Sequence, residues 1–395
     1  MTDEIQGLAA RDAVSDACRE TARATVDLDV VSRNVEVLCK HAGSAAVMAV
    51  VKADAYGHGL LPCTRAALNG GASWLGVAQL SEAMLLRDAG ITAPLLSWLH
   101  VPGSDFTGAI VADVDLSVSA LWSLTEIAQA ARTLGRTARI HLKVDTGLGR
   151  NGAFGDDWQE LLPAARRLEA EGLVRIVGIW SHFVYADDPK HPTVRHQEER
   201  FAEAVHDAER AGCDLEVRHI ANSAATLTNS GAAYDLVRPG LAVYGLSPVP
   251  DLGDPQSFGL TPAMTLSADL AVTKELPAGQ GLSYGHQYVT SQDTTVGLVP
   301  IGYADGIPRN ATNVGPVAVG GTRHTIAGRV CMDQFVVDLG PGSQAQAGDR
   351  AILFGTGESG EPTAQDWAEA TGTISYEIIS RIGLRVPRVY VGGQP

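Results

Sequence analysis

The chain has 395 residues, of which 45% are hydrophobic and 19% charged, a composition typical of a well-packed soluble enzyme and unlike that of a disordered or membrane protein. Its 45 acidic and 30 basic residues give a formal net charge of −15 at pH 7, which disfavours binding to nucleic acid. The length exceeds that of one ordinary compact core, so two domains are expected.

The cysteines and the N-terminus indicate the cellular compartment. The five cysteines are odd in number and scattered, which argues against a disulfide framework or a zinc site and favours a reducing cytoplasm. Residues 1–6 are acidic and lack the basic region and apolar core of a secretory signal. No later apolar run is long enough to span a bilayer. We therefore expect a cytoplasmic protein with neither a membrane nor a nucleic-acid partner.

Residues 24–245 alternate short apolar runs with longer amphipathic stretches, the pattern of repeated β-α units around a parallel sheet. The expected strands are residues 45–51, 74–78, 94–98, 114–118, 139–144, 176–180, 216–220 and 235–237. The expected helices between them include residues 121–134, 157–171 and 192–211. Eight is the number of strands that closes a (β/α)8 barrel, to which we assign residues 24–258.

After about residue 248 the sequence changes to β-branched and glycine-rich segments. Strands are expected at residues 264–273, 294–300 and 335–339, and a helical stretch within residues 364–383 precedes an extended segment at 386–391. The expected fold class is thus α/β, an eight-stranded TIM-like barrel followed by a mainly β domain over residues 259–395. Residues 1–23 form an N-terminal extension that packs near the second domain or is disordered.

Five ionisable residues fall at, or just after, the carboxyl ends of expected strands: Lys52, Lys143, His182, His219 and Arg238. Loops converge at this rim of a parallel barrel, which is where active sites form. Each residue alone has a structural alternative, as a surface group or a hydrogen-bonded core group. Five such residues on one rim of the barrel predict a functional site there.

Lys52 stands where an apolar strand opens into a small, glycine-rich loop that ends at Gly59. Desolvation at such a position lowers the pKa of an amine, as imine formation requires. The structural alternative is a lysine that extends along the barrel rim with its amine in water.

Residues 49–59 resemble the pyridoxal-phosphate signature of the alanine racemase family, and further motifs that resemble the family extend to Tyr376. This family consists of fold-type III enzymes that join a barrel to a β domain. The resemblance implies that the cofactor is pyridoxal 5′-phosphate, that Lys52 holds it covalently and that Tyr56 reaches its phosphate. Asp54 stands where asparagine is also common in the family.

Residues 219–225 and 235–245 resemble the rest of the family's cofactor site. The resemblance implies that Arg238 faces the pyridine nitrogen and, because a guanidinium hardly ever gives up its proton, leaves that nitrogen unprotonated. The implied cofactor-binding residues are Lys52, Tyr56, His182, His219, Asn222, Ser223, Arg238, Gly240, Leu241 and Tyr376. From the residues alone, Ser223 could instead be a helix cap, Arg238 the partner of an acid and His182 a core histidine.

Inversion of a stereocentre requires that a proton leave one face of the carbon and return to the other, so a second acid or base must oppose the lysine. Residues 281–288 resemble the family's catalytic tyrosine motif, with Tyr284 at the active position. In the family this tyrosine comes from the neighbouring subunit, which implies a homodimer with shared active sites. Without the resemblance, Tyr284 reads as ordinary half-buried packing.

The resemblance also implies the substrate contacts. Arg150 matches the arginine that binds the substrate carboxylate and the cofactor's phenolic oxygen, a task suited to its bidentate fork. The lysine matched by Lys143 is carbamylated in many members, and the backbone amide matched by Met332 contacts the carboxylate. Tyr303 and Tyr376 match two gate tyrosines, whose bulk favours a small side chain. No metal is expected.

The expected function is the interconversion of L-alanine and D-alanine, which supplies D-alanine for peptidoglycan. The alternatives are a racemase for serine or another small amino acid, a fold-type III decarboxylase and a non-catalytic pyridoxal-phosphate carrier. The sequence has no obvious cysteine-centred decarboxylase motif, and the carriers resemble the barrel alone.

Overall fold

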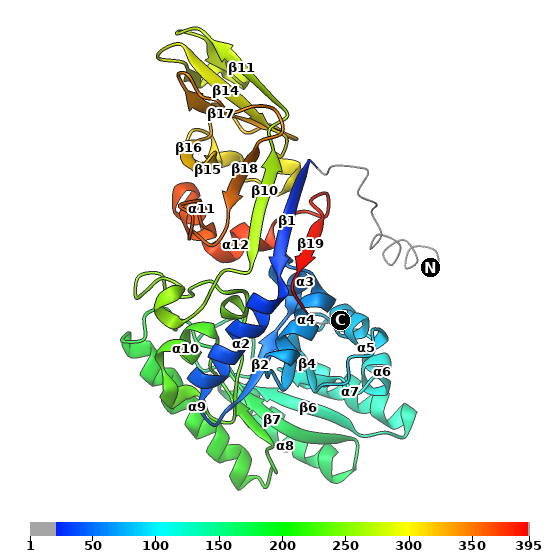
Figure 1. The fold of residues 1–395 in the computed structure, drawn as a ribbon. Helices are drawn as coiled ribbons and strands as arrows, with labels where there is room; N and C mark the ends of the chain where they lie inside the picture. The colour runs from blue at the N-terminus through cyan, green and yellow to red at the C-terminus, as the bar shows by residue number, and fades with distance from the viewer. Residues whose placement is uncertain (1–20, 394–395) are drawn as a thin grey trace. The chain divides into compact units, whose positions relative to one another are not determined.

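The computed structural model describes residues 21–393, which form two compact units (Figure 1). The barrel unit comprises residues 26–264, 374–381 and the residues from 390 onward, and the β unit comprises the segments between and before these. The units are interleaved in sequence, because two short segments after residue 373 return to the barrel unit.

The barrel unit is built on eight strands with the order β8-β7-β6-β5-β4-β3-β2-β9. They are β2 (Ala46–Val50), β3 (Trp74–Val77), β4 (Leu95–Ser97), β5 (Asp115–Val118), β6 (Ala138–Lys143), β7 (Val174–Trp180), β8 (Val217–His219) and β9 (Leu236–Val237). The paired neighbours in this order are parallel. Backbone bonds from Asp235 N to Arg218 O (3.2 Å) and from Arg238 N to Ala221 O (2.9 Å) join the last strands and close the barrel. The eight predicted strands and the predicted barrel are confirmed.

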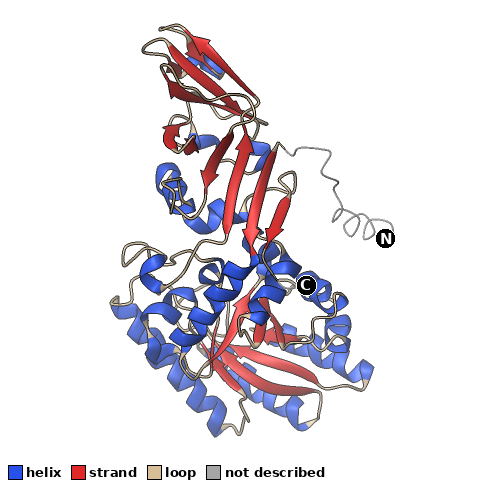
Figure 2. Ribbon diagram, viewed as in Figure 1, coloured by secondary structure: helices blue, strands red, loops and turns tan. Residues whose placement is uncertain are grey.

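Helices surround these strands (Figure 2). They are α2 (Leu28–Ala42), α3 (Lys52–Gly57), α4 (Leu60–Asn69), α5 (Leu80–Asp88), α6 (Phe106–Val111), α7 (Leu121–Leu134), α8 (Asp156–Ala170), α9 (Pro192–Arg210) and α10 (Ser223–Thr228), with α12 (Ser375–Ser380) from the C-terminal part of the chain. The prediction for α7 is confirmed at both ends, where the helix stops at Gly135 in a left-handed conformation. Of the helices within residues 21–393, none has the length and hydrophobicity needed to cross a membrane.

The β unit contains a six-stranded sheet of order β16-β15-β18-β10-β1-β19, a three-stranded sheet β11-β14-β17 and a hairpin β12-β13 (Figure 2). The strands are β1 (Ala22–Asp27), β10 (Met264–Asp269), β11 (Val272–Leu276), β12 (Gly281–Leu282), β13 (Tyr288–Val289), β14 (Thr294–Val299), β15 (Pro316–Val319), β16 (Thr322–Thr325), β17 (Phe335–Gly340), β18 (Arg350–Phe354) and β19 (Arg388–Val391). One further helix, α11 (Ala364–Thr371), begins at a capping box. The predicted mainly β second domain is confirmed as a fold class.

Two expectations were wrong in detail. The single strand predicted at residues 264–273 is two strands in different sheets, β10 and β11, which separate at Leu270. Residues 22–27, divided in the prediction between an extension and the barrel, form strand β1 with alternating burial. The rest of the predicted extension, residues 1–20, lies outside the described residues. β1 was missed because its partners, β10 and β19, are more than 200 residues away in the chain.

Candidate active site

A cavity of about 950 Å³ lies in the barrel unit. Eleven of the predicted site residues line it: Lys52, Tyr56, Lys143, Arg150, His182, Asn222, Ser223, Arg238, Gly240, Leu241 and Tyr376. His219 is fully buried and contacts Arg238. The other three predicted residues belong to the β unit, where Tyr284 is 71%, Met332 53% and Tyr303 40% exposed. The structure therefore gathers the predicted barrel residues and leaves these three on another unit.

Lys52 is followed by a left-handed turn. Ala53, Asp54, Ala55 and Tyr56 all have φ values of 53–54°, although none is glycine. This conformation costs about 1–2 kcal/mol per residue, so contacts must stabilise it. The amide of Ala53 donates to Glu82 Oε1 at 2.6 Å, and the amide of Leu60 donates to Asp54 Oδ1 at 2.7 Å. Nothing in the residue types of this segment predicted the turn.

The strain gives a stability prediction. Ala53 is exposed and left-handed, so Ala53→Gly is expected to stabilise the protein by about 1 kcal/mol through removal of the Cβ clash. Ala130→Gly, in the right-handed helix α7, is the matched control and should instead destabilise by about 1 kcal/mol. Urea unfolding midpoints of the two variants measure both changes, and equal signs would contradict the assigned strain.

Four cationic side chains line the cavity: Lys52, Lys143, Arg150 and Arg238. Burial, together with the charge of Arg150, lowers the pKa of the Lys52 amine, while Glu82 partly offsets the shift. Burial followed by the charges of Arg238 and Arg150 lowers the pKa of Lys143 to about 7. Two consequences follow: the cavity attracts anions, and its lysines are shifted toward the neutral, nucleophilic form.

Arg238 is held from several sides. Its Nη2 donates to the carbonyl oxygens of Ser181 (2.7 Å) and Ile220 (3.2 Å), and lies 3.3 Å from His182 Nδ1. Its Nη1 lies 3.1 Å from His219 Nδ1. Burial lowers the pKa of this guanidinium to about 9, which leaves it protonated at neutral pH. Because a guanidinium only donates, both imidazoles must accept from it and are neutral on that side.

Hydroxyl groups and backbone amides gather at another part of the cavity. Ser223 Oγ accepts from the amides of Gly240 (2.8 Å) and Ala242 (3.3 Å), so the amide of Gly240, one of the predicted cofactor-binding residues, bonds Ser223 here. The ring of Tyr56 lies 6.2 Å from that of Tyr376. A Cβ on Gly240 would overlap the Tyr56 hydroxyl, so glycine is needed for this close approach.

This donor set fits pyridoxal phosphate. The phosphate requires hydroxyl donors in a cationic surrounding: Ser223, Tyr56 and Tyr376 provide the hydroxyl groups, and the four cationic side chains line the same cavity. The aldehyde requires an amine with a lowered pKa, and Lys52 has one. The ring nitrogen requires a fixed partner, and Arg238 lines the same cavity.

Several residues of the site were not predicted. The ring of Trp180 stacks on His219 at 5.7 Å and lies 4.8 Å from the guanidinium carbon of Arg238, so it packs both residues. Trp98 lines the cavity near the Lys52 amine, which is 5.9 Å from its ring. Both tryptophans end expected strands, and this position was the available signal for them.

Comparisons with known proteins show the family of this chain. The family models "Alanine racemase, N-terminal domain" and "Alanine racemase, C-terminal domain" match residues 26–248 and 263–390. The chain is 60% identical over 368 residues to an alanine racemase of Frankia casuarinae, which covers 93% of this chain and 96% of that protein. It is 56% identical over 375 residues to that of Streptomyces coelicolor, which covers 94% of this chain and 96% of that protein.

Solved structures give the same result. The crystal structure of the alanine racemase from the D-cycloserine-producing Streptomyces lavendulae matches with a TM-score of 0.94 at 56% identity, over 95% of this chain and 98% of that one. That of Bacillus anthracis, with bound L-Ala-P, matches with a TM-score of 0.87 at 35% identity, over 95% of this chain and 96% of that one. The chain therefore belongs to the alanine racemase family, whose members are pyridoxal-phosphate-dependent isomerases.

Proposed function

We propose that this protein interconverts L-alanine and D-alanine, with Lys52 and the partner subunit's Tyr284 as the two acid/base groups. The observation that carries the proposal is the amine of Lys52, with a lowered pKa, in a cationic cavity shared with Arg238 and Arg150. When bound, pyridoxal phosphate withdraws electrons from the substrate α-carbon and so weakens its bond to hydrogen. The protein has to hold the substrate and move the proton.

The cavity residues divide this work. Lys52 holds the cofactor and moves a proton at Nζ on one face of the α-carbon. Arg150 lines the same cavity and binds the substrate carboxylate through its bidentate fork. Arg238 stays protonated and would face the pyridine nitrogen of the cofactor, where a group that only donates would keep that nitrogen unprotonated and the ring a weak electron sink. Tyr56, Ser223 and Tyr376 bind the phosphate.

A second subunit completes the site in this proposal. Tyr284, Met332 and Tyr303 are exposed on the β unit, as groups that reach into a neighbouring cavity must be. A two-fold homodimer would form two such shared sites. There the Tyr284 hydroxyl moves the proton on the opposite face, the Met332 amide contacts the carboxylate, and Tyr303 limits the side chain. We propose that this dimer works in the cytoplasm and supplies D-alanine for peptidoglycan.

Exchange of the α-hydrogen tests the reaction. The holoenzyme in D₂O with L-alanine should incorporate deuterium at the α-carbon and produce D-alanine without release of carbon dioxide, as NMR and chiral chromatography measure. Release of carbon dioxide would identify a decarboxylase. Absence of any exchange would exclude both enzymes and favour the non-catalytic cofactor carrier. A parallel assay with L-serine separates the two racemase alternatives, and we expect alanine to be the faster substrate because Tyr303 and Tyr376 restrict the pocket.

We further propose that Lys143 is carbamylated. Its pKa of about 7 leaves a large neutral fraction of the amine, whose Nζ can bond the carbon of CO₂ with loss of one proton, and the anion formed is stabilised by Arg150 and Arg238. After equilibration with ¹³C-bicarbonate, the enzyme should show a carbamate ¹³C signal that weakens as the pH falls below about 7. Lys143→Met is the control, and a signal that survives it would contradict the assignment.

A further inference from the structure

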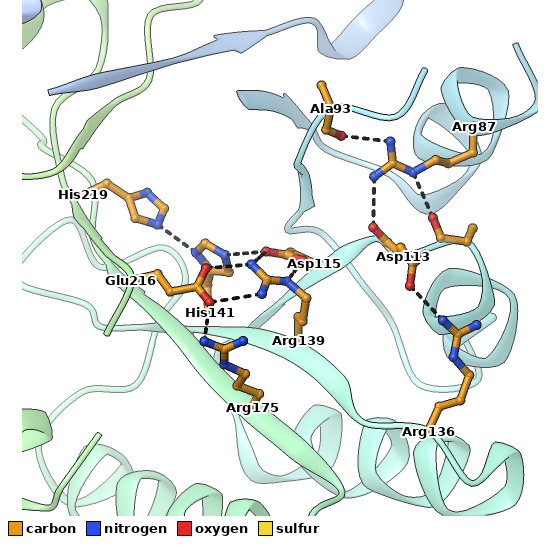
Figure 3. A network of polar contacts seen from close by, with 11 residues as sticks. Arg87, Ala93, Asp113, Asp115, Arg136, Arg139, His141, Arg175, Glu216 and His219 are labelled. Carbon is orange, nitrogen blue, oxygen red and sulfur yellow. Dashed lines mark hydrogen bonds and ion pairs between the residues drawn. The ribbon is translucent and has the colours of Figure 1, made fainter. Parts of the chain in front are cut away.

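Arg238 stands at one end of a buried chain of polar groups. Figure 3 shows the other members of this chain, His219, His141 and Asp115. His219 Nδ1 lies 3.1 Å from Arg238 Nη1, and His219 Nε2 lies 2.9 Å from His141 Nδ1. His141 Nε2 in turn lies 3.1 Å from Asp115 Oδ2. Both imidazoles are fully buried, and Asp115 is 3% exposed. The chain thus crosses the barrel from strand β9 through β8 and β6 to β5.

Only one arrangement of hydrogens satisfies this chain when both imidazoles are neutral. Arg238 can only donate, so His219 accepts at Nδ1 and carries its hydrogen on Nε2. That hydrogen is donated to His141 Nδ1, so His141 carries its own hydrogen on Nε2 and donates it to the Asp115 carboxylate. Every bond points away from Arg238 and toward Asp115.

The far end of the chain is anchored as an anion. Arg139 binds Asp115 through Nε to Oδ1 (2.8 Å) and Nη2 to Oδ2 (3.2 Å), and also contacts Glu216, which pairs with Arg175 at 2.7 Å. Burial alone would raise the pKa of the Asp115 carboxyl, but the hydrogen bonds from His141 and Arg139, with the charge of Arg139, outweigh it and lower this pKa. Figure 3 shows Arg139 between the two carboxylates. Asp115 is therefore a fixed acceptor.

The backbone makes room for this arrangement. His141 lies opposite Gly178 in the parallel register of β6 and β7. A Cβ on Gly178 would overlap His141 Nδ1, the atom that accepts from His219. The absence of a side chain at Gly178 therefore allows the ring of His141 to occupy this position.

We propose that Asp115 and His141 are positioning residues, which fix the tautomer of His219 and thereby hold the Arg238 guanidinium in its place in the cavity. With Nδ1 of His219 confined to the role of acceptor, one Nη1 hydrogen of Arg238 is bound and the other is left for a ligand in the cavity. The inference rests on the proposed function, because the position of Arg238 affects a reaction rate only if the protein racemises alanine.

Neutron diffraction from crystals of the unmodified holoenzyme tests the arrangement without any substitution. Hydrogen is expected on Nε2 and absent from Nδ1 in both His141 and His219. Hydrogen on Nδ1 of either ring would overturn the proposal, because the donors of Arg238 or of His219 would then face another donor.

A matched pair of variants tests the effect on the reaction. In His141→Asn the side-chain amide can replace Nδ1 and accept from His219, whereas in His141→Gln the amide reaches the place of Nε2 and leaves His219 without its acceptor. We expect His141→Gln to lose at least about tenfold more in kcat than His141→Asn, with little difference in KM or in the Kd for pyridoxal phosphate. A purely space-filling role predicts the opposite order, because asparagine leaves the larger void.

Equal kcat values for the two variants, or a larger loss in His141→Asn, would overturn the positioning role. If neither variant folds, the neutron result on the unmodified enzyme decides alone. Failure of this inference differs from failure of the proposed function: in the first case the unmodified enzyme racemises alanine but has the wrong tautomers or variant order, and in the second it does not racemise alanine.

Discussion

Tyr284→Phe and Lys52→Ala are each expected to lower alanine racemisation by on the order of 10² or more, since each removes one of the two proton carriers. Tyr284→Phe keeps the aromatic ring and should retain pyridoxal phosphate, because Tyr284 belongs to the β unit and the cofactor-binding cavity belongs to the barrel unit. Racemisation rates and cofactor absorbance measure the two properties. A Tyr284→Phe variant with near-parental activity would exclude the tyrosine as the opposing base.

Mixing the two inactive proteins tests whether the sites are shared. If the partner subunit's Tyr284 serves the cavity that contains Lys52, a heterodimer has one site without either group and one intact site. Activity should then return to about half the parental value per heterodimer. Each inactive protein incubated alone under the same exchange conditions is the control. No recovery after heterodimers have been demonstrated would place both groups in the same subunit.

Gly245→Ala is expected to destabilise the protein by about 3 kcal/mol. Gly245 has φ +80°, and a Cβ there would overlap the carbonyl oxygen of Thr261, a backbone atom that cannot rotate away. Gly135→Ala separates the cost of the positive φ from the cost of the steric overlap. Gly135 also has a positive φ, 63°, but no atom lies within 4 Å of the added Cβ. Gly135→Ala should lower the free energy of unfolding by only about 1 kcal/mol. Urea unfolding midpoints of the holoenzymes measure both changes, and equal shifts would show that the Thr261 overlap is relieved.

Much of the barrel could be predicted because its strands are buried on both faces and therefore appear as continuous apolar runs. The prediction of α7 is confirmed at both ends because Gly135 ends the helix. The second unit was harder to predict: the residue types of β10 and β11 do not show that the chain changes sheets at Leu270. Strand β1 depends on pairing across most of the chain, which no local pattern reports.

The candidate site also contains features that the sequence predicts and features that it does not. The rim position of Lys52, Lys143 and Arg238 follows from strand ends, and the structure places all three on one cavity. The roles of these residues, and those of Tyr284 and Met332, stay predictions. The left-handed turn after Lys52 was not predicted, because the contacts that stabilise it include Glu82, which comes from a separate helix. Asp115 and His141 were also missed, since within strands they read as ordinary polar positions.

The position of β1 between β10 and β19 has a consequence for synthesis on the ribosome (Figure 1). Residues 46–237, which supply all eight strands of the barrel sheet, leave the exit tunnel before either partner of β1 has emerged from it. The nascent chain therefore carries an early strand with unpaired edges while the barrel behind it is already able to close. It pairs on one side after residues 264–269 emerge, and on the other only near the end of translation. During that interval the unpaired edges of β1 are the kind of surface at which nascent chains aggregate, and which chaperones protect.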